Sequence, residues 1–173
     1  MQARLLLVHS PLIGCESWEP IATDLAAEGY AVAVPDLSSA IAAGPPYHLR
    51  QASMIADSAA GRPVILVGHS RGGWLLATAG TMLGKKGVRG YVFVDARLPV
   101  PGRSWMQTSR PDLAVRLREM ADPQGWLPPW PQWWGAGELA ALLPDPAVRR
   151  HFAAGCPRLP LAMFEEVHPP VPG

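Results

Sequence analysis

Ser70 is the residue whose surroundings in this sequence most clearly indicate chemistry. It stands in the motif Gly68-His69-Ser70-Arg71-Gly72, after the apolar run 64–67 and before a segment typical of a helix. Glycines two positions before and after a serine permit the sharp turn that presents a hydroxyl above the end of a strand. The motif predicts that the Ser70 hydroxyl attacks a carbonyl carbon and that the Arg71 N–H stabilises the oxyanion. The alternative is a glycine-rich turn whose serine only caps the helix.

A serine nucleophile needs a neighbouring proton acceptor, and the sequence offers several candidates without deciding among them. Asp95 follows a strand-like run and is the candidate acid; the alternative is a carboxylate that accepts hydrogen bonds from loop amides. His168 follows the last expected helix and is the candidate base; the alternative is a solvated tail residue. Of the other histidines, His9 and His69 are expected to support or line the pocket around Ser70. His48 and His151 are expected to lie on the surface.

The elements that must position these residues alternate in type along the first part of the chain. Branched apolar runs predict strands, and the segments between them have helical spacing. The expected strands are 4–10, 30–36, 63–68 and 88–95, the expected helices 17–28, 48–60 and 74–83, and the segment 40–46 is expected to be a loop. This alternation predicts an α/β fold with a parallel sheet, whose ligands bind beyond the carboxyl ends of the strands. Ser70 and Asp95 both fall there.

The chain after Leu98 has a different texture, with many prolines and most of the tryptophans. Prolines divide it into short helices, expected at 111–120, 146–152 and 159–167, with no strand pattern. Such a segment is not expected to form its own core, so it should lie over the sheet as a helical lid. The chain is thus expected to be one domain with a core, 1–97, and a cap, 98–173. The cap tryptophans should pack within the lid, and Trp130 and Trp134 are assigned to an apolar pocket wall.

Composition excludes several classes of function. The formal net charge is +1 and long runs of Lys and Arg are absent, so a nucleic-acid partner is not expected. Apolar runs are too short for a membrane helix and the amino terminus does not read as a secretory signal, so we expect a cytoplasmic protein with no membrane partner. Cys15 and Cys156 lack metal-ligand spacing and are expected to be free thiols. Neither a metal nor an organic cofactor is implied.

Four motifs together resemble the α/β-hydrolase family over residues 4 to 97. They are Leu7-Val8-His9-Ser10-Pro11-Leu12 at the family's oxyanion loop, Val34-Pro35-Asp36-Leu37 after the second strand, the Ser70 motif, and Val92-Phe93-Val94-Asp95-Ala96 before the cap. The resemblance implies a three-layer fold and a serine that attacks a carbonyl, with a histidine as base and an acid that orients it.

The sequence departs from the family pattern in ways that affect the chemistry. The family's acid usually follows the seventh strand and its histidine the eighth; this sequence ends where the cap should lead into the seventh, so both are expected to be missing. Pro11 has no N–H to complete the oxyanion hole, and the Leu12 N–H or the Ser10 hydroxyl is expected to replace it. The strand edge at 91–95 should then be exposed. Such an edge invites pairing with another chain, and the partner we expect is a second copy, in a homo-dimer.

Three functions are compatible with these observations. The leading hypothesis is a serine hydrolase that acts on a small apolar ester, thioester or lactone. The second is a non-catalytic relic of the fold that binds apolar ligands or assembles with other chains. The third, suggested by the position of Ser10, is a lyase similar to the hydroxynitrile lyases of the family.

Overall fold

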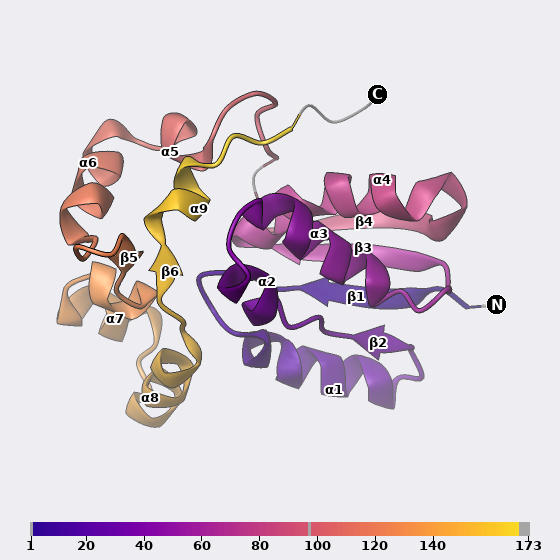
Figure 1. Ribbon diagram of the computed structural model, residues 1–173. Helices are drawn as coiled ribbons and strands as arrows, with labels where there is room; N and C mark the ends of the chain where they lie inside the picture. Colours follow the sequence, from indigo (N-terminus) through magenta and orange to yellow (C-terminus); the bar gives the residue numbers. More distant parts are fainter. Residues whose placement is uncertain (1, 97, 170–173) are drawn as a thin grey trace.

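The core of the protein is a parallel β-sheet. The computed structural model describes residues 2–96 and 98–169. In this part of the chain, four parallel strands lie in the order β2-β1-β3-β4. Their bounds are β1 (Arg4–Val8), β2 (Val32–Ala33), β3 (Val64–His69) and β4 (Val88–Val94). The predicted parallel α/β fold is therefore confirmed (Figure 1).

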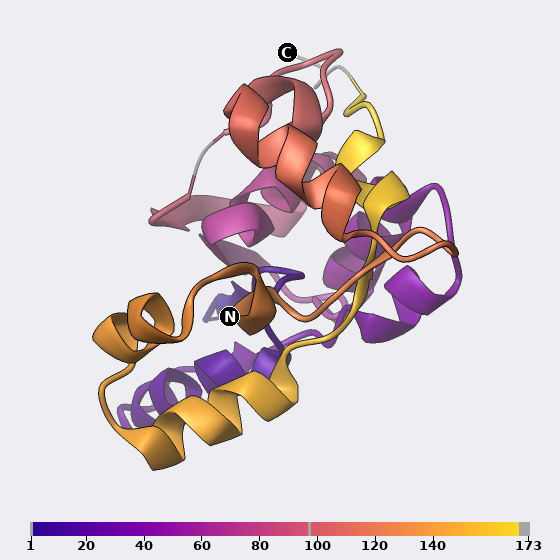
Figure 2. The same ribbon diagram turned by 90° about the vertical axis from the view of Figure 1, so that its left-hand side faces the viewer.

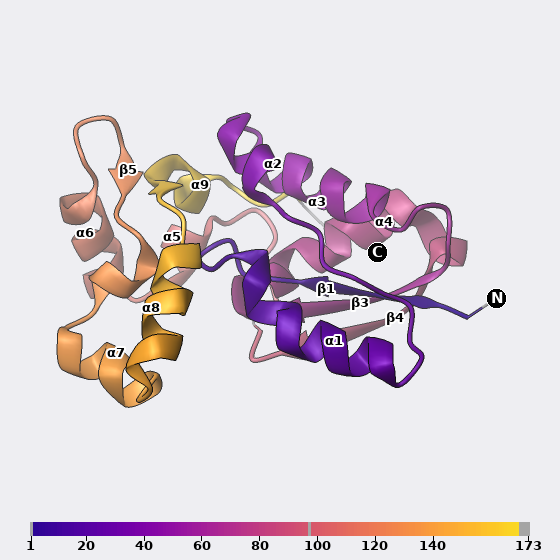
Figure 3. The same cartoon turned by 90° about the horizontal axis from the view of Figure 1, so that it is seen from below.

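Helices cover both faces of the sheet and give the expected three layers (Figures 1 and 3). On one face, α1 (Glu19–Ala27) and the 3₁₀ turn η1 (Cys15–Trp18) pack against Leu7 and Val67. On the other face, α3 (Tyr47–Asp57) and α4 (Leu76–Gly87) enclose a second apolar cluster. Successive residues of β1 from Leu5 to Val8 thus belong to different clusters, which explains why the strand is apolar at each of these positions.

The segment between β2 and α3 differs from the prediction. The expected strand 30–36 is reduced to two residues, and the expected loop 40–46 is wrong because it includes most of α2 (Ser38–Ala42). The carboxylate of Asp36 accepts hydrogen bonds from the N–H and the hydroxyl of Ser38, both at 2.9 Å. This exposed aspartate therefore orients the start of α2.

The cap contains short helices and one small sheet. Its helices are α5 (Trp105–Thr108), α6 (Pro111–Met120), η3 (Trp130–Trp133), α7 (Ala136–Leu142), α8 (Pro146–Gly155) and α9 (Leu161–Glu165). The expectation of no strands is wrong, because β5 (Trp126–Leu127) and β6 (Leu159–Pro160) form an antiparallel pair. Each strand has two residues, too few for a periodic pattern to show. The last helix consequently begins at Leu161 instead of Leu159.

The cap lies at the carboxyl ends of the strands, as expected of a lid (Figures 1 and 2). The expectation that it forms no core is wrong. Leu117, Leu127 and Phe164 are fully buried in a cluster made mainly of cap residues, which Ile41 and Tyr47 of the core complete. Among the described helices, none has the length and apolarity that a bilayer crossing requires.

Candidate active site

The turn between β3 and the 3₁₀ helix η2 (Ser70–Leu75) places Ser70. Its φ is +51°, in the left-handed region that costs a residue with a side chain about 1–3 kcal/mol. A Cβ on Gly68 would lie 2.8 Å from the Cα of Gly73, and a Cβ on Gly72 would lie 2.6 Å from the Val8 carbonyl oxygen. Only glycine fits at either position, so close backbone packing holds the serine in its strained conformation. This is the geometry that the sequence motif predicts.

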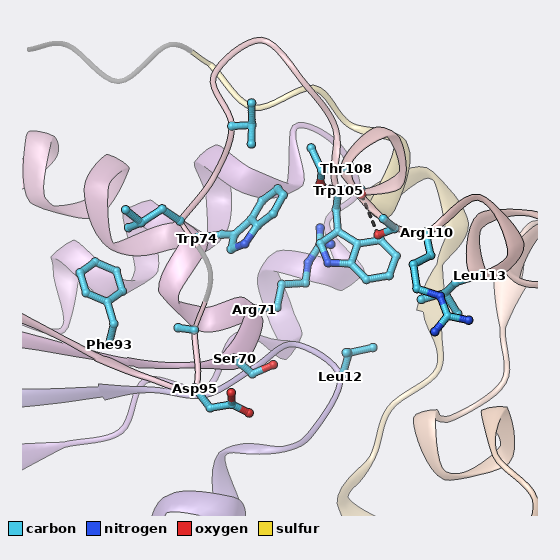
Figure 4. A pocket seen from close by; sticks show the side chains of 14 residues that line it. Leu12, Ser70, Arg71, Trp74, Phe93, Asp95, Trp105, Thr108, Arg110 and Leu113 are labelled. Carbon is cyan, nitrogen blue, oxygen red and sulfur yellow. Dashed lines mark hydrogen bonds between the residues drawn. The ribbon is translucent and has the colours of Figure 1, made fainter.

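Ser70 opens onto a cavity of about 720 Å³ between the core and the cap (Figure 4). Ligand cavities of proteins commonly have volumes of about 300–1,000 Å³. Large apolar side chains from both regions contribute to its walls: Leu12, Trp74, Phe93, Leu98, Trp105 and Leu113. Its polar residues are Ser70, Arg71, Asp95, Thr108, Ser109 and Arg110. The cavity can therefore receive a small apolar molecule and present it to a hydroxyl.

Asp95 is the carboxylate that shares this cavity with Ser70. Its backbone φ is +45°, so the chain turns sharply where β4 ends. The side chains of Asp95 and Ser70 point toward the same part of the cavity (Figure 4). Two residues with left-handed backbones thus end the neighbouring strands β3 and β4 and bring a hydroxyl and a carboxylate to one place.

The predicted oxyanion loop is only partly at the cavity. Leu12 contributes to the lining, whereas Ser10 and Pro11 do not. The Leu12 N–H donates to the Ser10 hydroxyl oxygen at 3.3 Å, so this N–H already has an acceptor. The N–H of Arg71 lies in the first turn of η2, where the helix itself supplies no acceptor. Arg71 is therefore the better placed of the predicted oxyanion donors.

His9 and His69 support the site from behind. Nδ1 of the His9 ring lies 2.7 Å from the Ile13 carbonyl oxygen, and Nε2 accepts a hydrogen bond from the Leu37 N–H at 3.4 Å. These contacts fit a structural role for His9. The sequence predicts that His69 supports or lines the pocket; it does not line the cavity, and its ring packs edge-on against Trp18. Burial lowers the pKa of His69, while the nearby Asp95 carboxylate opposes this shift.

His168, the predicted base, lies in a different place from Ser70. Its side chain is 4% exposed, and its ring centroid lies 4.2 Å from that of His48 and 4.6 Å from that of Trp74. Burial, together with the nearby His48 and Arg71, lowers the pKa of His168 to about 3. Within 2–96 and 98–169, the lining of the Ser70 cavity contains no histidine.

His48 corrects another expectation, because it is buried and not on the surface. Its Nε2 lies 2.6 Å from the Thr78 hydroxyl, and burial, aided by Arg71, lowers its pKa to about 4. The backbone N–H groups of Tyr47 and His48 donate to the Glu166 carboxylate at 2.7 and 2.8 Å. The end of the cap is thereby fastened to the start of α3. His151 is exposed, as expected.

The Arg71 side chain joins the turn at residues 68–72, called the elbow below, to the cap. Its guanidinium is buried, donates to the Met163 carbonyl oxygen at 2.9 Å and lies 4.6 Å from the ring centroid of Phe164. Burial lowers the pKa of Arg71 to about 9, with the Glu166 carboxylate opposing the shift. The arginine therefore stays charged at neutral pH and holds the lid over Ser70.

The tryptophans of the cavity wall are not the predicted Trp130 and Trp134. Trp130 packs against Trp134 and Phe152 inside the cap, and neither Trp130 nor Trp134 lines the cavity. The wall is formed instead by Trp74, which follows the elbow, and Trp105, which begins α5. A capping box between Ser104 and Gln107 marks the start of α5 and could have indicated a helix directly after the linker.

Cysteines and metal-ligating side chains add no further chemistry to this site. Cys15 and Cys156 are free thiols, as expected. Burial raises the pKa of Cys156 to about 11, with Glu16 adding to the shift, so this thiol is protonated at neutral pH. Among the described residues, no group of three His, Cys, Asp or Glu side chains has a metal-binding arrangement.

Comparison with known proteins identifies the family to which the fold belongs. Residues 5–172 match the model of the alpha/beta hydrolase family. A structure of an extracellular alpha/beta-hydrolase from a Paenibacillus species is 19% identical, with a TM-score of 0.76 over 96% of this chain and 71% of that chain. Its description states structural and functional homology to tobacco salicylic acid binding protein 2. A search of curated proteins found no significant match.

Two further structures are similar at the same level. Tomato methylketone synthase I, in a complex of its H243A variant with beta-ketoheptanoate, is 18% identical, with a TM-score of 0.67 over 97% of this chain and 73% of that chain. A pyrethroid hydrolase from Sphingobium faniae JZ-2 is 19% identical, with a TM-score of 0.64 over 97% of this chain and 73% of that chain. At these identities the similarity shows the fold alone.

Proposed function

Because the chain belongs to the alpha/beta hydrolase family, we propose that it is a serine hydrolase that cleaves a small apolar ester, thioester or lactone through an acyl-enzyme on Ser70. The observation that carries this proposal is the strained serine at the floor of a cavity that both apolar and polar side chains line. A backbone held in an unfavourable conformation by close packing is typical of functional residues. The apolar walls favour an uncharged acyl group over a charged one.

The first half of the reaction forms the acyl-enzyme. The Ser70 hydroxyl passes its proton to Asp95, the one carboxylate among the described lining residues, as its oxygen attacks the carbonyl carbon. The Arg71 N–H stabilises the oxyanion of the tetrahedral intermediate. The intermediate then expels the alcohol or thiol, which takes the proton from Asp95.

The second half releases the acid. A water molecule gives a proton to Asp95 and attacks the acyl carbon, and the Ser70 oxygen leaves and recovers the proton. A carboxylate is a weaker base than an imidazole, so turnover should be slow. Loss of the base from a serine-histidine-acid site leaves roughly 10³–10⁴-fold catalysis over water.

Labelling with a fluorophosphonate probe tests the nucleophile. Ser109 is a matched control, because it lines the same cavity but its hydroxyl donates to the Trp105 carbonyl oxygen at 2.9 Å. We expect the wild type and Ser109→Ala to be labelled and Ser70→Ala not to be. Equal labelling of the wild type and Ser70→Ala would remove the basis of the proposal.

The proton acceptor has a test of its own. Asp95→Asn removes the carboxylate with little change in shape and should lower the labelling rate by roughly tenfold or more. Asp36→Asn is a control on an exposed aspartate that lies outside the cavity lining. If Asp95→Asn reacts as fast as the wild type, Asp95 does not accept the proton.

A second candidate function is a ligand-binding protein without turnover. It is favoured by the lack of a histidine among the described residues that line the cavity. Because Trp74 and Trp105 are in the wall, binding of an apolar ester should change the tryptophan fluorescence. Fluorescence change with neither labelling of Ser70 nor release of alcohol would favour this candidate over the hydrolase.

A further inference from the structure

A second, much smaller cavity lies beside the Ser70 cavity, and the proposed function does not use it. Arg71 and Trp74 line both cavities, so the two are neighbours. The small cavity has a volume of about 10 Å³ and is lined by polar side chains from three parts of the fold: His48 of α3, Arg71 of η2 and His168, which follows α9. These three residues are only 5%, 8% and 4% exposed. The described residues themselves therefore form and bury this cavity.

Each of these three side chains has a buried nitrogen without a hydrogen-bonding partner in the described part of the chain. They are Nδ1 of His48, Nη1 of Arg71 and Nδ1 of His168. Other nitrogens of the same side chains are engaged: Nε2 of His48 lies 2.6 Å from the Thr78 hydroxyl, and Nη2 of Arg71 donates to the Met163 carbonyl oxygen. Buried polar atoms are nearly always hydrogen-bonded, to the protein or to ordered water. Three such nitrogens on the residues that line one cavity point to a small bound molecule.

The size of the cavity selects water among small molecules. One water molecule needs a cavity of about 10–15 Å³, and this cavity has about 10 Å³. A buried water typically makes about three hydrogen bonds to polar atoms that lack other partners. The three nitrogens of His48, Arg71 and His168 supply this number.

The hydrogen-bonding capacity of water also fits the three nitrogens. Because the pKa values of His48 and His168 are lowered mainly by burial, both rings are neutral at neutral pH, and each has one N–H and one accepting nitrogen. Nη1 of Arg71 can only donate. A water molecule accepts from Arg71, and it can still donate to one Nδ1 and either accept from or donate to the other. An anion such as chloride only accepts, so it would need a proton on both Nδ1 atoms.

The charges around the cavity favour a neutral ligand as well. Glu166 contributes to the lining, and its carboxylate opposes the lowering of the Arg71 pKa by burial. The buried guanidinium thus already has a negative charge in its neighbourhood. A bound anion would add a second negative charge at a buried place, where a charge without its own partner is costly.

From size, hydrogen bonding and charge together, we infer that this cavity binds one water molecule, which joins His48, Arg71 and His168 by hydrogen bonds. The water links the core to the cap, because His48 and Arg71 belong to the core and His168 follows the last helix of the cap. It also holds the side chain of Arg71, the residue next to Ser70. The inference does not depend on the proposed function, since the cavity and its three nitrogens are the same whether or not Ser70 is a nucleophile.

A crystal structure of the wild type in sodium chloride tests the identity of the ligand. We expect one oxygen atom within about 3.2 Å of Nδ1 of His48, Nη1 of Arg71 and Nδ1 of His168. Data collected at a long wavelength identify chloride, which scatters anomalously there, whereas oxygen does not. An anomalous peak in the cavity, or no electron density between the three nitrogens, overturns the inference.

Magnetic relaxation dispersion of ¹⁷O water counts the long-lived internal waters in solution. His168→Phe removes one of the three nitrogens and keeps an aromatic ring, so the count should fall by one relative to the wild type. His151→Phe is the matched control, an exposed histidine on α8, and should leave the count unchanged. An equal count in His168→Phe and the wild type contradicts a water held by His168.

A measurement on the wild type alone decides the question if His168→Phe fails to fold. Rotating-frame Overhauser spectra should show a cross-peak between water and the ring protons of His48 and His168, because a bound water lies next to both rings. The exposed ring of His151 should show no such long-lived contact. Absence of the cross-peak at both buried rings overturns the inference. None of these readouts depends on whether Ser70 is labelled.

Discussion

The elbow at Ser70 and the cap above it are held in place by different interactions. At the elbow, Gly68 and Gly72 lie against backbone atoms that cannot move aside. The cap is joined to the core mainly by side chains, the Arg71 guanidinium on Met163 and the Glu166 carboxylate at the start of α3. The core therefore fixes the position of Ser70, while the cap fixes the shape of the cavity through contacts that mutation or pH can weaken.

The largest effect is expected where the elbow is packed against β1. Gly72→Val would place carbon atoms against the carbonyl oxygens of Val8 and His9, and overpacking of this kind costs about 3 kcal/mol or more. We expect urea denaturation to show this loss, or the variant not to fold. Gly137→Ala in α7 is the control, since nothing lies within 4 Å of its Cβ, and it should be at least as stable as the wild type. Equal stability of Gly72→Val would show that the elbow is not sterically fixed.

Acid should weaken the contact between cap and core. His48 and His168 have pKa values lowered to about 4 and about 3, mainly by burial, against about 6.5 in the unfolded chain. Above pH 6.5 both states are neutral and the full stability is present. As pH falls from 6.5 toward 4, the unfolded state binds protons that the folded state does not, so the free energy of unfolding falls. The slope is about 1.4 kcal/mol per pH unit for each histidine.

Denaturation curves between pH 7 and about 4.5 measure this slope. His168→Gln should reduce it, and His151→Gln, at an exposed position, should leave it unchanged. A slope that is the same in all three proteins would mean that His168 takes up its proton as readily in the folded as in the unfolded state.

A smaller loss is expected when the carboxylate link is weakened. Glu166→Gln removes the charge that accepts two N–H groups at the start of α3 and should cost about 1–2 kcal/mol. Glu165→Gln, at the adjacent position, loses only an exposed ion pair with Arg118 and should change stability by less than about 0.5 kcal/mol. Amide hydrogen exchange should localise the effect of Glu166→Gln to α3 and residues 159–168, with the sheet still protected. Faster exchange throughout the sheet would contradict a separate attachment of the cap.

The smallest effect is expected within the cap itself. Trp134 is partly exposed and packs on Trp130 away from the cavity, so Trp134→Ala should leave the binding of an apolar ester unchanged. Trp105→Ala removes part of the cavity wall and should weaken binding by roughly tenfold. Titration followed by the remaining tryptophan fluorescence compares the two. Equal losses would mean that the cap tryptophans act as one unit.

The core was predictable from local patterns, and the cap only in part. The strands at 4–8 and 64–69 are mainly apolar and largely buried. The strand at 88–94 also shows as an apolar run at 91–94, although these side chains are exposed in the described part of the chain. The helices α6 and α8 each begin with a proline, which is common at the first position of a helix. A single residue was therefore enough to predict where each of them starts. In contrast, β5 and β6 are too short to show a period and exist because two distant segments meet. The tryptophans of the cavity wall, Trp74 and Trp105, could not be predicted from the sequence for the same reason, because they come from two distant segments that meet only in the fold.

The sequence by itself determined the parallel sheet, the order of its strands and helices, and the turn that presents Ser70, because periodicity and glycine spacing act over a few residues. Only the tertiary structure decided which side chains share the cavity with Ser70. It brought Asp95 to the cavity and placed His168 in a buried cluster with His48. The N–H of His48 in turn donates to the carboxylate of Glu166, 118 residues away in the sequence. Such partners are chosen by packing between segments that are distant in the chain, and no local pattern records them.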